Sequence, residues 1–308
     1  MKIELTEVAP RDGLQSLPEP VPVGTKIELV RRAANAGFRR VEVTSFVSPR
    51  AVPQLADAEA VLAGLAGLNT VTLEALVPNL RGAERVARTA VQDWVCFLSA
   101  SESHSQANAN CSVTEALARI EPVIDLARRC NRTPVAAIAT AFGCPFEGII
   151  PVSQTMRLVL ALRDRGIRRI KFGDTIGTAT PRQVHELAEQ LKDKAPEIQP
   201  VLHLHDTRGL ALPCVLAGIN AGFTRFESSI GGIGGCPFAP GATGNVASED
   251  LVHFLHAEGH DTGIDLAALI DTGRWLEGQL GRPLPARMLR VSPIGTTVPL
   301  PDGLRARG

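Results

Sequence analysis

The stretch Gly37-Phe38-Arg39-Arg40-Val41 decides the fold, because variants of it recur twice in the chain. They are Gly166-Ile167-Arg168-Arg169-Ile170 and Gly222-Phe223-Thr224-Arg225-Phe226. Each copy begins with a glycine suited to end a helix, continues through an apolar residue and polar residues, and leads into an apolar strand. A junction of one kind, used three times, indicates a chain built from repeated helix–strand units.

The segments around these junctions alternate between strand and helix. Apolar and β-branched runs predict eight strands, at residues 3–8, 40–43, 70–76, 94–99, 135–142, 169–172, 201–205 and 225–229. Helical spacing and capping signals predict helices at residues 26–36, 57–66, 80–90, 112–130, 152–166, from 180 onward and 211–221, then at 248–258 and 265–280. Residues 9–13, after the first strand, are expected to form a polar turn.

Eight parallel strands with intervening helices predict a TIM (β/α)8 barrel with an additional C-terminal helix. We expect residues 1–308 to form a single TIM-barrel domain, with a C-terminal helical extension from about residue 260 to 308 packed on the barrel. The alternative is an open doubly wound sheet. It is disfavoured because no Gly-x-Gly-x-x-Gly motif follows the first strand.

Composition narrows the class of partner and the compartment. Lys and Arg together number 32, as do Asp and Glu, so the net charge of zero favours neither nucleic acid nor an anionic membrane as a partner. No apolar run approaches the roughly 20 residues that cross a bilayer. Six scattered cysteines without a CxxC motif argue against a disulfide framework and a thiolate zinc site. We therefore expect a cytoplasmic protein.

Two histidines stand two positions apart in Val201-Leu202-His203-Leu204-His205-Asp206. On a strand, residues two apart share a face, so both imidazoles would project side by side and suit a divalent metal. Taken alone, the pair is better explained as two structural histidines, because short motifs often match by chance. The residues at the ends of the other predicted strands alter that balance.

Polar residues follow several of the predicted strands, at the end where a TIM barrel carries its active site. They are Arg11 and Asp12, Glu42, Asp174, His203 and His205, and the glycine-rich segment 231–245 with Cys236 and Asn245. Buried polar groups are costly and seldom gather without a function. We therefore expect these side chains to form one site.

Four of these residues make a mixed nitrogen and oxygen ligand set: Asp12, His203, His205 and Asn245. Two imidazoles with one carboxylate suit Zn, Fe or Mn, and an added amide oxygen favours Mg²⁺ or Mn²⁺. A carboxylate before Gly13 is also typical of a simple turn.

Arg11 and Cys236 each have two interpretations. Arg11 suits an oxyanion or a carboxylate, and its alternative is a salt bridge at the barrel mouth. Cys236 lies among glycines that suit a mobile cover, where a thiol meets substrate. The alternative is a small residue in a glycine-rich turn.

Seven motifs together resemble 3-hydroxy-3-methylglutaryl-CoA (HMG-CoA) lyases, in a group of barrel metallolyases that includes isopropylmalate synthase. They are Pro10-Arg11-Asp12-Gly13-Leu14-Gln15, Thr44-Ser45-Phe46-Val47-Ser48-Pro49, Leu76-Val77-Pro78-Asn79, Gly143-Cys144-Pro145, Gly173-Asp174-Thr175-Ile176-Gly177, His203-x-His205-Asp206-Thr207 and Gly234-Gly235-Cys236-Pro237. The likeness runs in order from about Glu7 to Leu255. The Arg11-Asp12 and His-x-His elements are shared with the wider group, whereas the Cys236 loop is specific to the lyases.

The resemblance implies a metal-dependent carbon–carbon lyase acting on a branched 3-hydroxyacyl-CoA. Asp12, His203, His205 and Asn245 would hold Mg²⁺ or Mn²⁺. Deprotonation of the substrate hydroxyl starts a retro-aldol (Claisen-type) cleavage, and Arg11 would stabilise the departing enolate of acetyl-CoA. With HMG-CoA the other product is acetoacetate, which would place the enzyme in leucine degradation and ketone-body formation. The resemblance also implies a homodimer, with the helix at 265–280 as an interface element.

Further roles are implied for residues around the ligand set. Cys236, Asp174 and Glu42 are the family's candidates for proton transfer and for organising the site, and Gln15 and Arg208 are expected to contact substrate. Arg208 and Leu210 stand where well-known members carry Tyr and Gln, and residues 135–137 read Val-Ala-Ala in place of Arg-Gly-Tyr. These departures leave the acyl group open between HMG-CoA, citramalyl-CoA and longer 3-hydroxy-3-alkylglutaryl-CoA esters.

Two other classes of function compete with the lyase. A condensing enzyme of the wider group usually carries a further domain after the barrel, whereas this sequence stops at Gly308. A non-catalytic barrel that binds CoA esters would be expected to lack part of the ligand set, and here every expected ligand is present. The lyase is the favoured hypothesis.

Overall fold

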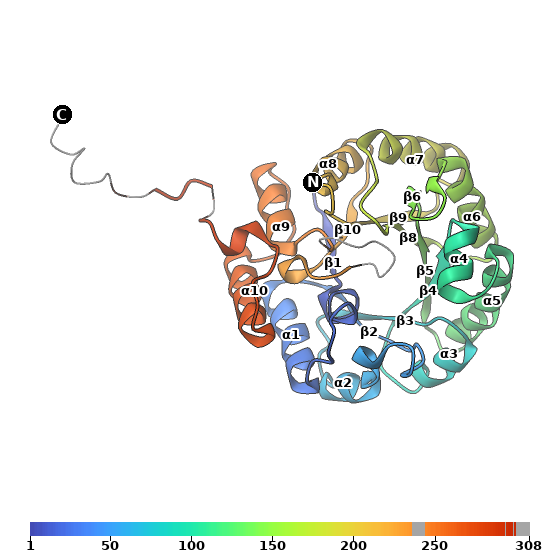
Figure 1. Ribbon diagram of the computed structural model, residues 1–308, viewed down its shortest axis with the longest axis horizontal. Coiled ribbons are helices and arrows are strands. Elements are labelled where there is room, and N and C mark those ends of the chain that lie inside the picture. The colour runs from blue at the N-terminus through green and yellow to red at the C-terminus, as the bar shows by residue number, and fades with distance from the viewer. Residues whose placement is uncertain (236–243, 293, 298, 300–308) are drawn as a thin grey trace.

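A computed structural model of the chain describes residues 1–235, 244–292, 294–297 and 299. Eight parallel strands close into a barrel in the order β1-β10-β9-β8-β5-β4-β3-β2, ringed by helices (Figure 1). The strands are β1 Glu4–Glu7, β2 Arg40–Ser45, β3 Thr72–Leu76, β4 Asp93–Ser99, β5 Thr133–Ala139, β8 Arg169–Asp174, β9 Gln199–Leu204 and β10 Arg225–Ser228. The prediction of a TIM barrel is confirmed.

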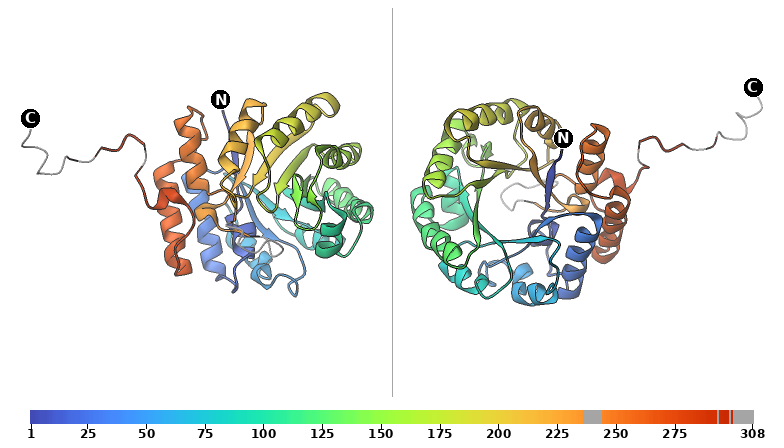
Figure 2. Two further views of the ribbon diagram at one scale, coloured as in Figure 1. Left: turned by 45° about the horizontal axis from the view of Figure 1, so that its top comes forward. Right: turned by 180° about the vertical axis from the view of Figure 1, so that it is seen from behind.

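The helices cover the outside of this barrel (Figure 2). They are α1 Val23–Ala36, α2 Ala58–Gly64, α3 Leu80–Val86, α4 Glu102–Ala109, α5 Val113–Arg129, α6 Val152–Asp164, α7 Pro181–Lys194, α8 Ala211–Asn220, α9 Ser248–Ala257 and α10 Leu266–Leu280. Large apolar side chains such as Trp94, Phe172 and Phe226 are fully buried in the core. In the described ranges no helix is long and apolar enough to span a membrane.

The repeated junction forms as the sequence predicts. Gly37, Gly166 and Gly222 adopt positive φ angles of 115°, 77° and 96°, which glycine tolerates best. The arginines that follow begin β2, β8 and β10 and meet Glu4 of β1 at the N-terminal end of the barrel. Arg40 Nε and Arg225 Nε lie 3.7 and 3.6 Å from Glu4 Oε1, and Arg169 pairs with the same oxygen. The repeat thus ties the first strand to three others.

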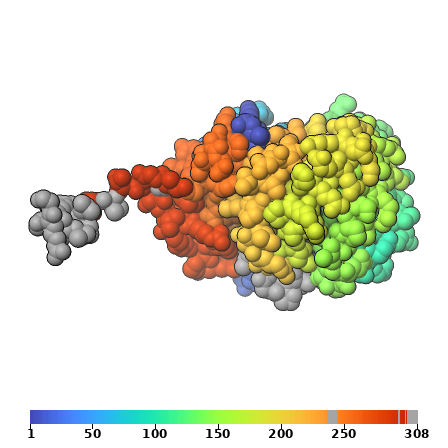
Figure 3. All heavy atoms as spheres, turned by 90° about the horizontal axis from the view of Figure 1, so that it is seen from above, coloured from blue at the N-terminus to red at the C-terminus, as the bar shows by residue number. Residues whose placement is uncertain are grey.

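The C-terminal helix α10 packs against α1, α9 and the short turn η3 (Ile230–Gly232), at one edge of the molecule (Figures 2 and 3). Asp265 caps α10 by accepting hydrogen bonds from the N–H groups of Ala267 and Ala268. Gly37 permits this packing, since a Cβ there would lie 2.2 Å from the carbonyl oxygen of Gly263. Residues after the short turn η4 (Arg287–Leu289) were predicted to lie in the extension, and only some of them fall in the described part.

The structure adds to the local predictions in some places and contradicts them in others. Residues 9–13 form a π-helical turn, η1 (Ala9–Gly13), in which the Val8 carbonyl accepts from three successive N–H groups. The fifth strand ends at Ala139, not at residue 142, because Thr140 has a φ of 53° and turns the chain. Helix α4 and the small hairpin of β6 (Gly143–Cys144) with β7 (Gly148–Ile149) were not predicted. Helix α4 is mostly polar, so its sequence carries little amphipathic signal.

Candidate active site

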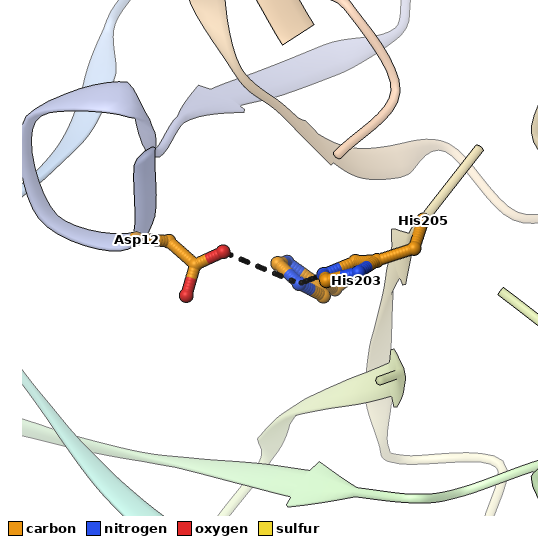
Figure 4. Close-up of side chains that lie close together, drawn as sticks. All are labelled: Asp12, His203 and His205. Carbon is orange, nitrogen blue, oxygen red and sulfur yellow. Dashed lines mark hydrogen bonds and ion pairs between the residues drawn. The ribbon is translucent and has the colours of Figure 1, made fainter. Parts of the chain in front are cut away.

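Three predicted metal ligands converge at the C-terminal end of the barrel (Figure 4). Asp12 lies in η1, directly after β1, and His203 lies near the end of β9. His205 falls one residue beyond β9, where its backbone pairs with Asn245 in an isolated bridge. The Nε2 atoms of the two histidines are 3.2 Å apart, and His203 Nε2 is 3.9 Å from Asp12 Oδ2.

Asn245, the fourth predicted ligand, borders the same site and is 4% exposed. Its Nδ2 donates to Asp12 Oδ2 at 2.8 Å and to the Ile233 carbonyl at 3.1 Å. The amide nitrogen therefore faces Asp12. Asn245 would bind a metal through oxygen only with its amide flipped, so that Oδ1 and not Nδ2 lies beside Asp12.

Burial and neighbouring charges set the protonation of the three ligands. Burial favours a higher pKa for Asp12, but Arg11, His203 and His205 outweigh it and lower that pKa to about 2. Burial, with His203 close by, lowers the pKa of His205 to about 4, so this imidazole is neutral at pH 7. Burial alone would lower the pKa of His203, yet the hydrogen bond and charge of Glu227 raise it.

This arrangement fits a divalent cation. The two Nε2 atoms and one Asp12 oxygen all lie within 4.8 Å of one another. Two imidazole nitrogens facing each other are satisfied together when a metal accepts both lone pairs. His205 Nδ1 is buried and makes no hydrogen bond within the described ranges. A carboxylate and two imidazoles are donors that Mn²⁺, Zn²⁺ and Fe²⁺ accept, and an oxygen ligand from Asn245 would favour Mg²⁺ or Mn²⁺.

Arg11 lies beside the ligands and is held by two carboxylates. Its Nε donates to Glu42 Oε1 at 2.5 Å and its Nη1 donates to Asp12 Oδ1 at 2.6 Å. Burial opposes the positive charge, but Glu42 and Asp12 outweigh it and raise the pKa of Arg11. A fixed cation one residue from a metal ligand is well placed to stabilise negative charge on a substrate.

Asp174 ends β8, next to β9. One oxygen, Oδ1, accepts from the N–H groups of Thr178 (2.7 Å) and Ala179 (3.0 Å), which fixes the loop after β8. Burial raises the pKa of Asp174 to about 6, so the group exchanges protons near neutral pH.

The remaining predicted site residues are distributed around this rim. Arg208 Nη1 donates to the carbonyls of Ile176 (2.7 Å) and Gly177 (3.2 Å). These bonds link the loop after β9 to the loop after β8. Gln15 follows η1, and its Oε1 is buried and makes no hydrogen bond to any described residue. Cys236 lies outside the described residues, so its predicted role stays a prediction.

The sequence analysis missed a second charged cluster inside the barrel, in which Glu42, Glu74 and Glu227 surround Lys171. Only Glu42 was among the predicted site residues. All four residues are at most 3% exposed. The available signal was a charged residue at an alternate position of an otherwise apolar strand, as in Arg169-Ile-Lys171-Phe. Which of these charges meet one another depends on strand register, which the sequence does not state.

Two further buried carboxyls support the loops that carry the site. Glu7 accepts from the N–H groups of Ala9 and Ile230, and so joins η1 to η3 (Ile230–Gly232) after β10. Glu249 accepts from the N–H of Gly231. Helix α10 can pack close to Glu249 because its residue 273 is a glycine. A Cβ on Gly273 would lie 2.2 Å from Glu249 Oε1.

The Glu249 carboxyl makes the stability of the protein depend on pH. Burial, with Glu7 and Asp250 nearby, raises its pKa from 4.5 to about 8, so the folded state holds a proton that the unfolded state releases. Its contribution is complete below pH 4.5 and is lost as the pH rises to about 8. We expect Glu249→Gln to gain stability over wild type across this window, by at most about 5 kcal/mol. Urea unfolding at pH 5, 6.5 and 8 measures this difference.

The exposed Glu258→Gln at the end of α9 is the control, and its unfolding free energy should run parallel to wild type at every pH. A constant difference between Glu249→Gln and wild type would show that the buried carboxyl does not hold a proton in the folded state.

Comparison with known proteins identifies the family of this chain. Residues 2–276 match the HMGL-like family. Hydroxymethylglutaryl-CoA lyase YngG of Bacillus subtilis is 41% identical over 290 residues, covering 94% of this chain and 97% of that protein. (R)-citramalyl-CoA lyase of Chloroflexus aurantiacus is 39% identical, with 95% of each chain covered.

The solved structures include a protein of the same kind. An HMG-CoA lyase from Acinetobacter baumannii, solved with coenzyme A and 3-methylmalate, superposes with a TM-score of 0.92 at 39% identity, covering 97% of this chain and 98% of that one. The resemblance that rested on seven motifs is confirmed over almost the whole sequence. The chain therefore belongs to the HMGL-like family, with HMG-CoA lyases among its relatives.

Proposed function

We propose that the protein is a divalent-metal-dependent lyase that cleaves a branched 3-hydroxyacyl-CoA, with HMG-CoA giving acetoacetate and acetyl-CoA as the favoured reaction. The observation that carries this proposal is the convergence of Asp12, His203 and His205 beside Arg11. When bound, Mg²⁺ or Mn²⁺ supplies Lewis-acid help by lowering the pKa of a hydroxyl that it contacts. The relatives named HMG-CoA lyase support the substrate class.

The roles of this chain's own residues follow from their contacts. The substrate hydroxyl loses its proton to a base, the adjacent carbon–carbon bond breaks, and its electron pair passes to the enolate of acetyl-CoA. A proton added to the enolate carbon then gives acetyl-CoA. Arg11 would stabilise that enolate oxygen. Asp174, with a pKa of about 6, suits proton transfer. Both oxygens of Glu42 are engaged, one by Arg11 and one by Lys171, so we assign it to holding Arg11 in place.

One experiment tests the function directly. Protein stripped of metal with EDTA is expected to be inactive, and Mg²⁺ or Mn²⁺ should restore cleavage of at least one ester in a panel of HMG-CoA, citramalyl-CoA and longer 3-hydroxy-3-alkylglutaryl-CoA esters. Mass spectrometry identifies the products. Full activity in protein verified as metal-free would contradict the metal requirement, and a fully metal-loaded protein that cleaves no ester would contradict the lyase assignment.

A citramalyl-CoA lyase is the second candidate, supported by the similarity to the Chloroflexus aurantiacus enzyme. We propose that Arg208 contacts the free carboxylate of the acyl group. Arg208→Ala should then lower kcat/KM for the preferred ester by about 10-fold to 100-fold, as expected for a lost charged hydrogen bond. Arg168→Ala is the control. Arg168 is exposed, directly precedes β8 at the N-terminal end of the barrel, and donates to backbone carbonyls. An unchanged kcat/KM for every active ester would refute this role.

We propose that the enzyme works in the cytoplasm as a homodimer built from single-domain subunits, with α10 as an interface element. Leucine degradation and ketone-body formation are the pathways proposed for the acetoacetate reaction. Sedimentation of the purified chain measures its oligomeric state.

A further inference from the structure

Three buried carboxylates from different strands converge on one ammonium group inside the barrel. Lys171 of β8 donates to Glu42 Oε2 of β2 at 2.7 Å. Its Nζ also lies 2.6 Å from Glu74 Oε2 of β3 and 2.5 Å from Glu227 Oε1 of β10. Charges buried this deeply persist only when they are paired, so the four side chains hold one another in place.

Two of these carboxylates use one oxygen for Lys171 and the other for the candidate active site. Glu227 Oε1 pairs with Lys171, while Oε2 contacts His203 Nδ1 at 2.9 Å. Glu42 Oε2 accepts from Lys171, while Oε1 accepts from Arg11 Nε at 2.5 Å. Lys171 is thus linked to the metal ligand His203 through Glu227, and to Arg11 through Glu42.

The third carboxylate points away from the site. Glu74 Oε2 pairs with Lys171, and Oε1 accepts from Arg40 Nη1 at 2.9 Å. Arg40 also pairs with Asp93 and Glu4, toward the N-terminal end of the barrel. Glu74 therefore shares the buried cluster but makes no hydrogen bond or ion pair with Arg11, Asp12, His203 or His205, which makes it a matched control.

The geometry of three carboxylate oxygens within 4.8 Å would also suit a metal ion. Here the ammonium of Lys171 already lies against one oxygen of each carboxylate, so the cluster contains its own cation. We interpret the cluster as support for the site above it, and not as a second metal site.

We propose that Lys171 is the positioning residue of the metal site: its ammonium orients Glu227 against His203 and Glu42 against Arg11. The inference rests on the proposed function in taking Asp12, His203 and His205 as metal ligands. With Glu227 fixed at Nδ1, the imidazole of His203 presents Nε2 toward Asp12 and His205. Groups that orient metal ligands in this way typically change metal affinity or activity by 10-fold to 100-fold when they are removed.

Binding of Mn²⁺ to the metal-free chain, measured by calorimetry, tests this role without any substrate. Lys171→Met keeps the length and apolar stem of the side chain but removes the cation, and its Kd for Mn²⁺ should rise by about 10-fold to 100-fold. Glu74→Gln removes a charge from the same cluster and should keep the Kd within about twofold of wild type. In steady-state kinetics with saturating metal, Lys171→Met should lower kcat more than it changes KM, because Arg11 is no longer held by an oriented Glu42.

A double variant guards against misfolding, since Lys171→Met leaves three buried carboxylates with less compensation. In Lys171→Met/Glu74→Gln one charge of each sign is gone, and its Kd is compared with that of Glu74→Gln. A folded Lys171→Met or double variant with the same Kd as its reference would overturn the proposal. So would a chain that folds in neither background, because Lys171 would then serve the fold alone. Wild-type protein that binds Mn²⁺ but cleaves no ester would refute the lyase and leave this test intact.

Discussion

Replacing His205 with alanine is expected to abolish carbon–carbon cleavage, with a fall in kcat of at least about 10³-fold. His205 supplies one of the two imidazole nitrogens that face Asp12, and it is 4% exposed. Its Nε2 lies 3.2 Å from His203 Nε2, so its loss leaves a single imidazole and a carboxylate. The variant is assayed with saturating Mg²⁺ and with Mn²⁺, and its metal affinity is measured by calorimetry.

His185 provides the matched control for this variant. It is an exposed histidine on α7, and His185→Ala should keep both activity and metal affinity. If His205→Ala bound Mn²⁺ as tightly as wild type and still cleaved its ester, the assignment of His205 as a ligand would be wrong.

Replacing Arg11 with lysine is expected to lower kcat by about 10²-fold to 10³-fold, the usual effect of removing an oxyanion-stabilising donor. Lysine keeps the positive charge but lacks the planar guanidinium fork. It cannot reproduce the pair of contacts that Nε makes with Glu42 and Nη1 makes with Asp12. The measurement is kcat and KM for the preferred ester at saturating metal.

Two comparisons separate this catalytic effect from a loss of metal. The Kd for Mn²⁺ of Arg11→Lys should change far less than its kcat, because the three ligands remain. Arg31→Lys, on the exposed surface of α1, should behave as wild type. A kcat for Arg11→Lys equal to that of wild type would exclude Arg11 from stabilising the enolate.

Much of the barrel could be predicted because its signals are local. A glycine that ends a helix depends only on its own backbone conformation, a positive φ angle. Gly37, Gly166 and Gly222 all adopt it. The capping boxes at Ser112 and Thr180 likewise form within four residues of chain. Such local patterns fix where helices begin and end, and alternation of helix and strand then determines the class of sheet.

The site was predictable to the extent that barrel topology brings strand ends together. Asp12 and the two histidines converge because β1 and β9 both border β10. The cluster around Lys171 was missed because its four members come from four different strands, and only the closed barrel places them around one centre. Helix α4 was missed for a different reason, since its few buried side chains leave almost no periodic pattern.

The pairing of β1 with β10 also determines when the barrel can close during synthesis of the chain. Glu4 lies opposite Arg225, so β1 can pair with β2 early but with β10 only after the ribosome has delivered most of the chain. At about 5–20 residues per second, that interval is on the order of 10–45 s. Until then one edge of β1 is open to other chains, and the charges of Lys2 and Glu4 discourage such association. Closure of the barrel, in which Arg225 pairs with Glu4, is therefore a late step in the synthesis and folding of this protein.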